Sequence, residues 1–165
     1  MAELESLFED TLRDVYYAER QILKALPKMV RAAENADLKK AFAEHREQTE
    51  EQVARLQQVF EIIGKRARGK TCPAINGIIE ECEELLDDVK EAGPVRDAGL
   101  AACGQAVEHY EMARYGTLLA WAKAMRKADA AALLEATLAE EKKADSLLSQ
   151  IANGTINKQA AAAAA

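Results

Sequence analysis

Apolar residues recur every three or four positions along most of the chain, which is the spacing of one face of an α-helix. In the first segment this stripe contains Phe8, Leu12, Val15, Ile22 and Leu26. Polar turns, glycines and the pair Gly93-Pro94 interrupt the pattern. It therefore predicts five helices, at about residues 2–33, 38–63, 73–91, 95–127 and 129–153.

Individual residues predict how these helices begin, bend and end. Pro27 lies inside the first segment and predicts a kink or local break there. Asp37 and Asp129 are the expected N-caps of the second and fifth helices. Gly64 and Gly154 are the expected stops of the second and fifth helices.

The connections between the helices predict the topology. Short turns join the first two helices and the last two, so each pair is expected to form a hairpin. The loop 65–70 and the helix at 73–91 form a long crossover between the hairpins. One such crossover is typical of ferritin-like bundles. We therefore expect an all-α, ferritin-like four-helix bundle with an additional short helix in the crossover. The bundle should cover residues 1–157, followed by a low-complexity alanine tail at 158–165.

Composition excludes several classes of protein. The formal net charge of -6 should repel nucleic-acid phosphates. No run of about 18 apolar residues and no apolar signal region occurs, so we expect no membrane association and a cytoplasmic location. The 3 cysteines have no CxxC spacing, which argues against a disulfide framework or a zinc ribbon. With two histidines and no glycine-rich phosphate loop, a hydrolase or nucleotide-dependent enzyme is not expected.

Three glutamates interrupt the apolar stripes of three different helices. Glu19 fills the gap between Val15 and Ile22, and Glu108 and Glu141 lie on the stripes of the fourth and fifth helices. An unpaired carboxylate in a core costs several kcal/mol, so such groups need partners or a metal ion. The alternative for Glu19 is a position at the stripe edge that reaches solvent.

Further candidate ligands lie close to these glutamates in sequence. Glu111 follows Glu108 by one turn, nearer the edge of the stripe, where pairing with Arg114 is the alternative. Asp145 follows Glu141 on the same face. His45 lies on the inward face of the second helix with Gln48 and Gln52, and the alternative for it is a hydrogen-bonded core residue.

Counting outward from the turns predicts which of these residues lie level. A last turn centred near residue 128 places Glu111 level with Asp145 and groups both with Glu108 and Glu141. A first turn centred near 35 or 36 places Glu19 level with Gln52. His45 is then about 10 Å away along the axis, which argues against one ion shared by Glu19 and His45.

Carboxylates with one imidazole suit iron or manganese better than zinc. The predicted metal ligands are Glu19, His45, Glu108, Glu111, Glu141 and Asp145. In the simplest arrangement Glu108 and Glu141 bridge two ions, Glu19 and Asp145 are terminal, and Tyr115 is a nearby hydrogen-bond donor. Such a site could react with peroxide or dioxygen. Because the chain has no rubredoxin-like cysteine set, turnover would need an external electron donor.

Several segments resemble the YciF/YciE stress-protein family: EDTLRDVYYAERQI, KTCPAINGIIEE, VEHYEMARYGTLLAWA and TLAEEKKAD. The resemblance implies a ferritin-like bundle, a role in stress responses and a homodimer. Glu108-x-x-Glu111 is also distantly similar to the third bundle helix of rubrerythrins. Ferritin-like di-metal proteins use Glu-x-x-His motifs, but this chain has His45-Arg-Glu-Gln48 and Glu141 with Asp145. One ion, or a pair with water-rich coordination, is therefore equally compatible.

Two other functions remain open at this point. One is a non-enzymatic, dimeric structural or stress protein with a hydrogen-bonded acidic core. The other, which the resemblance to dimers disfavours, is iron storage in a ferritin-like cage.

Overall fold

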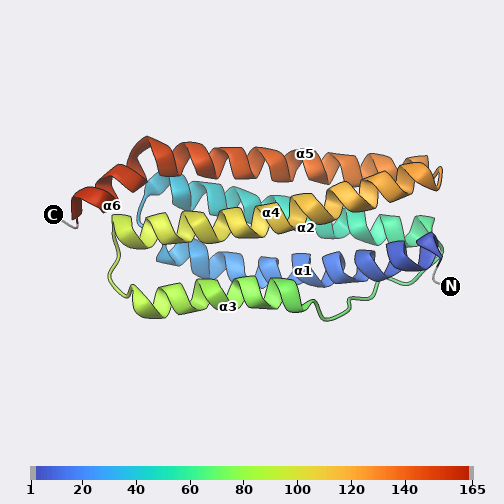
Figure 1. Cartoon of the computed structure of the whole chain (residues 1–165), viewed down its shortest axis with the longest axis horizontal. Helices are drawn as coiled ribbons and strands as arrows, with labels where there is room; N and C mark the ends of the chain where they lie inside the picture. The colour runs from blue at the N-terminus through green and yellow to red at the C-terminus, as the bar shows by residue number, and fades with distance from the viewer. Residues whose placement is uncertain (1–2, 164–165) are drawn as a thin grey trace.

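The computed structural model describes residues 3–163, and within that range the chain is helical without a strand. The elements are α1 (Leu4–Ala32), α2 (Ala36–Ile62), α3 (Pro73–Asp88), α4 (Pro94–Ala124), α5 (Ala128–Ile151), the π-helical turn η1 (Ala152–Ile156) and α6 (Asn157–Ala163) (Figure 1). The predicted all-α bundle is confirmed. None of the helices in this range is long and apolar enough to cross a membrane.

Four long helices form the bundle. Helix α1 packs against α2 and α4, and α5 packs against the same two helices. The crossover at residues 63–93 joins the two hairpins, and its helix α3 lies outside the bundle against α1 and α4 (Figure 1). This is the arrangement of two hairpins and one long connection that the loop lengths predict.

The helix ends differ from the predicted ones in several details. The N-cap of α2 is Asn35 rather than Asp37, and its side chain accepts hydrogen bonds from the backbone N–H groups of Asp37 and Leu38. Helix α5 follows Lys127, and Asp129 lies in its first turn without a capping bond. Helix α1 continues through Pro27 to Ala32, so the local break expected there does not occur.

The C-terminal segment is helical. Instead of stopping at Gly154, the backbone continues through the π-helical turn η1 into α6, which packs against α4. The segment expected to be a tail is therefore largely covered by α6. The predicted domain and tail also include residues 1–2 and 164–165, which lie outside the described residues.

A layer of buried polar side chains divides the apolar core into two clusters. One cluster contains Leu26, Phe42, Leu100 and Leu148, and the other contains Leu12, Leu56, Leu118 and Leu134. Thr11 on α1 and Asp97 at the start of α4 lie outside this layer, whereas the other buried polar residues fall at the boundary between the two apolar groups in the sequence of each long helix. They are Glu19 on α1, His45, Thr49 and Gln52 on α2, Glu108 and Glu111 on α4, and Thr137 and Glu141 on α5.

Candidate metal centre

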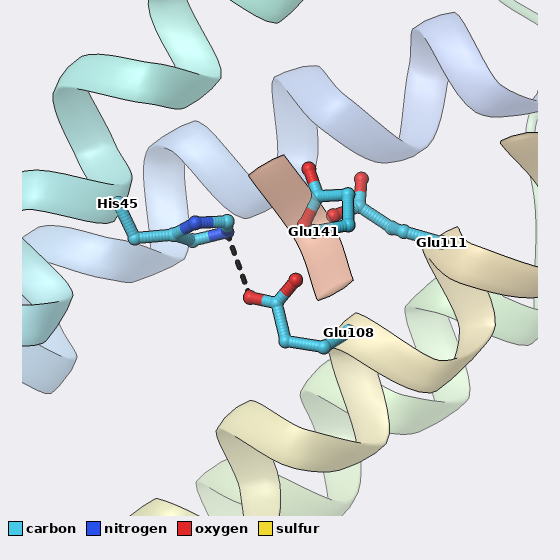
Figure 2. Close-up of side chains that lie close together, drawn as sticks. All are labelled: His45, Glu108, Glu111 and Glu141. Carbon is cyan, nitrogen blue, oxygen red and sulfur yellow. Dashed lines mark ion pairs between the residues drawn. The ribbon is translucent and has the colours of Figure 1, made fainter. Parts of the chain in front are cut away.

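Four side chains of the polar layer converge on one point. His45 of α2, Glu108 and Glu111 of α4 and Glu141 of α5 each offer one ligand atom, and these atoms all lie within 4.8 Å of one another (Figure 2). All four residues are buried. We call this group the acidic cluster.

The short α4–α5 connection sets the register of the acidic cluster. Helix α4 ends at Ala124 and α5 begins at Ala128, so the turn is centred on Arg126 rather than on residue 128. Glu111 and Glu141 are equally far from Arg126 along the chain and therefore lie level. The predicted pairing of Glu111 with Asp145 is wrong by one helical turn.

Asp145 accordingly lies outside the acidic cluster. Its Oδ1 is 3.1 Å from Nε2 of His109, whose side chain is 65% exposed. His109 faces outward as predicted, whereas the Asp145 side chain is only 19% exposed, its Oδ1 is buried without a hydrogen-bond partner, and its charge adds to the raised pKa of Glu108. Asp145 was expected to lie level with Glu111 because the turn was expected two residues later in the chain.

Glu111 is buried more deeply than the sequence pattern predicts. Its side chain is 0% exposed, and neither carboxylate oxygen has a hydrogen-bond partner. The alternative in which Glu111 pairs with Arg114 at the surface is therefore wrong. Glu141 is also fully buried, and its two oxygens likewise lack partners.

The side chains of His45 and Glu108 lie close together but do not form a well-aligned hydrogen bond. Nε2 of His45 is 3.0 Å from Oε1 of Glu108, but neither nitrogen of the ring makes a hydrogen bond of acceptable geometry. The two side chains are therefore close enough to act together, either as an ion pair or as two ligands of one cation. The alternative of a core histidine that pairs with a carboxylate therefore stays open beside metal ligation.

Burial makes the carboxylates of the cluster hard to ionise. It raises the pKa of Glu108 to about 7 and the pKa values of Glu111 and Glu141 well above the ordinary range. Neighbouring carboxylates add to this effect, since like charges at short distance disfavour ionisation. Each group must therefore hold a proton or face a cation.

Glu19 lies beside the acidic cluster and is partly satisfied. The Tyr115 hydroxyl donates a hydrogen bond of 2.5 Å to Oε1 of Glu19, while Oε2 has no partner. Burial, followed by the charge of Glu141, raises the pKa of Glu19 to about 8. The side chain is 0% exposed, so the solvent-reaching alternative is wrong.

The α1–α2 turn is also centred earlier than expected. Because α1 ends at Ala32 and α2 begins at Ala36, Glu19 lies level with Thr49 rather than with Gln52. His45 is one helical turn from that level, about 6 Å along the axis. Glu19 and His45 therefore lie closer together than the predicted separation, although Glu19 is not one of the four converging residues.

Sequence reasoning missed one ion pair beside the cluster. Nη2 of Arg55 lies 2.6 Å from Oε1 of Glu140, and the Gln52 side-chain amide donates to Oε2 of Glu140 at 3.1 Å. Arg55 lies off the apolar stripe of α2, and its only signal in the sequence is the i,i+4 spacing from Glu51. This pair holds α2 against α5 next to the acidic cluster.

Comparisons with known proteins agree with this fold. Residues 3–161 match the family described as a domain of unknown function, DUF892. The protein YciF of Escherichia coli K12 is 42% identical over 161 residues, which cover 97% of this chain and 96% of YciF.

Two solved structures cover most of the chain. The crystal structure of the E. coli stress protein YciF superposes with a TM-score of 0.90 at 41% identity, over 96% of this chain and 99% of that one. YcfI of Rhodopseudomonas palustris superposes with a TM-score of 0.87 at 46% identity, over 90% of this chain and 94% of that one. The chain therefore belongs to the DUF892 family, and within this family it resembles YciF over nearly its full length.

Proposed function

We propose that this protein is a stress-associated metal-binding protein that holds iron or manganese in the acidic cluster. One observation carries the proposal: the four carboxylate oxygens of Glu111 and Glu141 are buried, and no hydrogen bond reaches them except from a neighbouring carboxyl group that holds a proton. Leaving such groups unpaired costs about 1–3 kcal/mol each, and more when they are charged. A divalent cation at the centre would satisfy them together.

The donor set favours particular metals. Three carboxylates and one imidazole form a hard, oxygen-rich site, which suits iron or manganese better than zinc or copper. We assign His45, Glu108, Glu111 and Glu141 to the first ion. Asp145, which the sequence pattern also included, is not assigned to this ion.

A second ion would use Glu19. This carboxylate is the remaining buried acid beside the cluster, and it interacts with Glu111 and Glu141. Tyr115 would orient Glu19 through their hydrogen bond. A pair of ions held in this way would react with peroxide or dioxygen and would depend on an external electron donor for turnover.

Metal analysis of matched variants tests the proposal. After anaerobic reconstitution with Fe(II) or Mn(II) and desalting, the wild type should retain at least one ion per chain, and the double variant Glu108→Gln/Glu141→Gln should retain none. Asp129→Asn is the matched control and should retain as much metal as the wild type, because Asp129 lies in the first turn of α5, about three helical turns from Glu141. A wild type that keeps no metal would contradict the proposal.

The number of ions has its own test. Glu19→Gln should lower the metal content from two ions to one if Glu19 belongs to a second site. If the wild type and this variant both hold a single ion, the pair is excluded and the first site stands.

A structural role is the second candidate function. YcfI is described as a proposed structural protein, and in this chain Glu19 and Glu140 already have hydrogen-bonding partners. In this version the acids of the polar layer stay protonated and serve only to hold the bundle together. The response of thermal stability to a chelator separates the two candidates.

The homodimer implied by the resemblance remains a prediction. Gel filtration should give twice the 18.0 kDa of one chain. Elution as a large shell would instead favour the storage cage.

A further inference from the structure

A cavity of about 290 Å³ opens beside the acidic cluster, with its lining drawn from all four bundle helices and α3. Its walls are largely apolar and include Ile22, Leu26, Phe42, Ile79, Leu100 and Leu148. A cavity of this kind, with apolar walls and few polar groups, is typical of sites for small organic molecules.

The polar groups of the cavity are placed at two ends. His45 and Glu108 belong to both the cavity lining and the acidic cluster, so they form the wall between the two. They are 6% and 2% exposed, and both nitrogens of His45 and Oε2 of Glu108 lack hydrogen-bond partners. Because these atoms have almost no accessible surface, a polar group at the inner end of the cavity reaches them only when the His45 and Glu108 side chains shift.

The other end meets solvent. Exposed charged side chains complete the lining there: Lys24, Lys28, Glu44, Glu83 and Lys143. Lys28 and Glu83 form a 3.7 Å ion pair that joins α1 to α3. The cavity therefore leads from a charged mouth, past apolar walls, to a polar floor at the acidic cluster.

We propose that this cavity binds an amphiphilic molecule with an apolar body and one uncharged hydroxyl or hydroperoxyl head, seated at His45 and Glu108. The volume is about twice the roughly 150 Å³ that holds a benzene ring, which suits a chain of about eight carbon atoms. A carboxylate head is disfavoured, because it would face the acids of the cluster. An uncharged head can both donate to Glu108 and accept from His45.

The substrate class that we infer is an organic hydroperoxide. This part of the inference rests on the proposed metal site. Two Fe(II) ions would give one electron each to the hydroperoxide. With two protons the O–O bond breaks, the alcohol and water leave, and two Fe(III) ions remain. The external electron donor then returns both ions to Fe(II).

Binding to the metal-free protein tests the cavity independently of the metal. By calorimetry, 1-octanol should bind saturably and octanoate at least tenfold more weakly. Ala144→Phe and Ala25→Phe fill the cavity from α5 and α1, and each should weaken octanol binding at least tenfold. Ala139→Phe, an exposed position on the same helix as Ala144, is the matched control and should bind like the wild type.

Two results would overturn the cavity proposal. One is that the wild type shows no saturable binding of octanol. The other is that the folded Ala144→Phe and Ala25→Phe variants bind octanol as tightly as the wild type. Circular dichroism establishes that each variant is folded.

Oxidation of the iron-loaded protein then tests the substrate class. Octyl hydroperoxide should oxidise bound Fe(II) at least tenfold more slowly in Ala144→Phe than in the wild type, while hydrogen peroxide should act equally on both. Equal slowing of the two oxidants, or of neither, would reject the organic hydroperoxide. If no iron binds but octanol does, the metal proposal fails and the amphiphile site stands.

Discussion

At the residue scale, the sequence identifies a buried acid where the acid fills a gap in an apolar series. Glu19, Glu108 and Glu141 each occupy such a gap, and each is at most 2% exposed. Glu111 is equally buried but lies toward the edge of the pattern, because an idealised 100° step does not include how closely α5 approaches α4. Burial of a single residue could therefore be predicted only where the apolar series on both sides is regular.

The raised pKa values predict how the stability of the metal-free protein depends on pH. Because the pKa values of Glu108 and Glu19 are raised to about 7 and about 8, the folded state binds more protons than the unfolded state between about pH 4.5 and 8. The free energy of unfolding should therefore be highest near pH 5 and should fall as pH rises to 8, by up to about 1.4 kcal/mol per pH unit for each extra proton.

Urea unfolding of the chelator-treated protein at several pH values measures this slope. The double variant Glu108→Gln/Glu141→Gln should show a smaller slope, since two of the titrating acids are gone. A stability that rises between pH 5 and 8 would show that the cluster is ionised in the folded state without metal.

At the scale of helices and turns, the apolar period and the breakers predict the helices, but they do not determine the exact residues at which the helices begin and end. Asn35 caps α2 two residues before the expected Asp37, and α5 starts before Asp129. When the centre of a turn shifts by two residues, the residue that lies level with a given partner on the next helix changes by four positions, which is about one helical turn. For this reason the sequence could predict the topology and most of the acids, but not the partner of Glu111.

Asp97 links the start of α4 to the turn between α1 and α2, and we expect this link to stabilise the fold. It lies in the first turn of α4, is 3% exposed, and accepts hydrogen bonds from the backbone N–H groups of Glu34 and Asn35 at 2.9 and 2.7 Å. Asp97→Ala would leave these two donors without their partner. It should lower the free energy of unfolding by about 2–4 kcal/mol, given about 1.5–3 for a hydrogen bond to a charged group.

Asp129→Ala is the matched control in chemical denaturation. Asp129 occupies the first turn of α5 and makes no capping bond, so its loss should remove only the helix-dipole interaction, under about 1 kcal/mol. Equal losses in the two variants would mean that the link between Asp97 and the α1–α2 turn contributes nothing beyond the helix dipole.

At the scale of the whole molecule, the polar layer interrupts an otherwise continuous core. Burial of the two apolar clusters stabilises the bundle, while the layer between them contains acids whose ionised form is disfavoured by burial. The alternation of the clusters with the layer is visible in the sequence of every long helix. The cavity is not visible there, because it arises where α3 from the crossover leaves space against the bundle helices.

Removal of metal tests which role the layer plays. If the acidic cluster holds an ion, binding at a free metal concentration of 100 times Kd adds about 2.7 kcal/mol. A chelator should then lower the melting temperature of the reconstituted wild type by about 5–10 °C, the shift expected for a chain of this size. The double variant Glu108→Gln/Glu141→Gln should not respond, and it should melt above the metal-free wild type because two buried acids have become neutral amides. Differential scanning calorimetry measures all four states. If the melting temperature of the wild type stays unchanged after the chelator has been added, protons rather than an ion satisfy the layer, and the structural role takes the place of the metal-binding one.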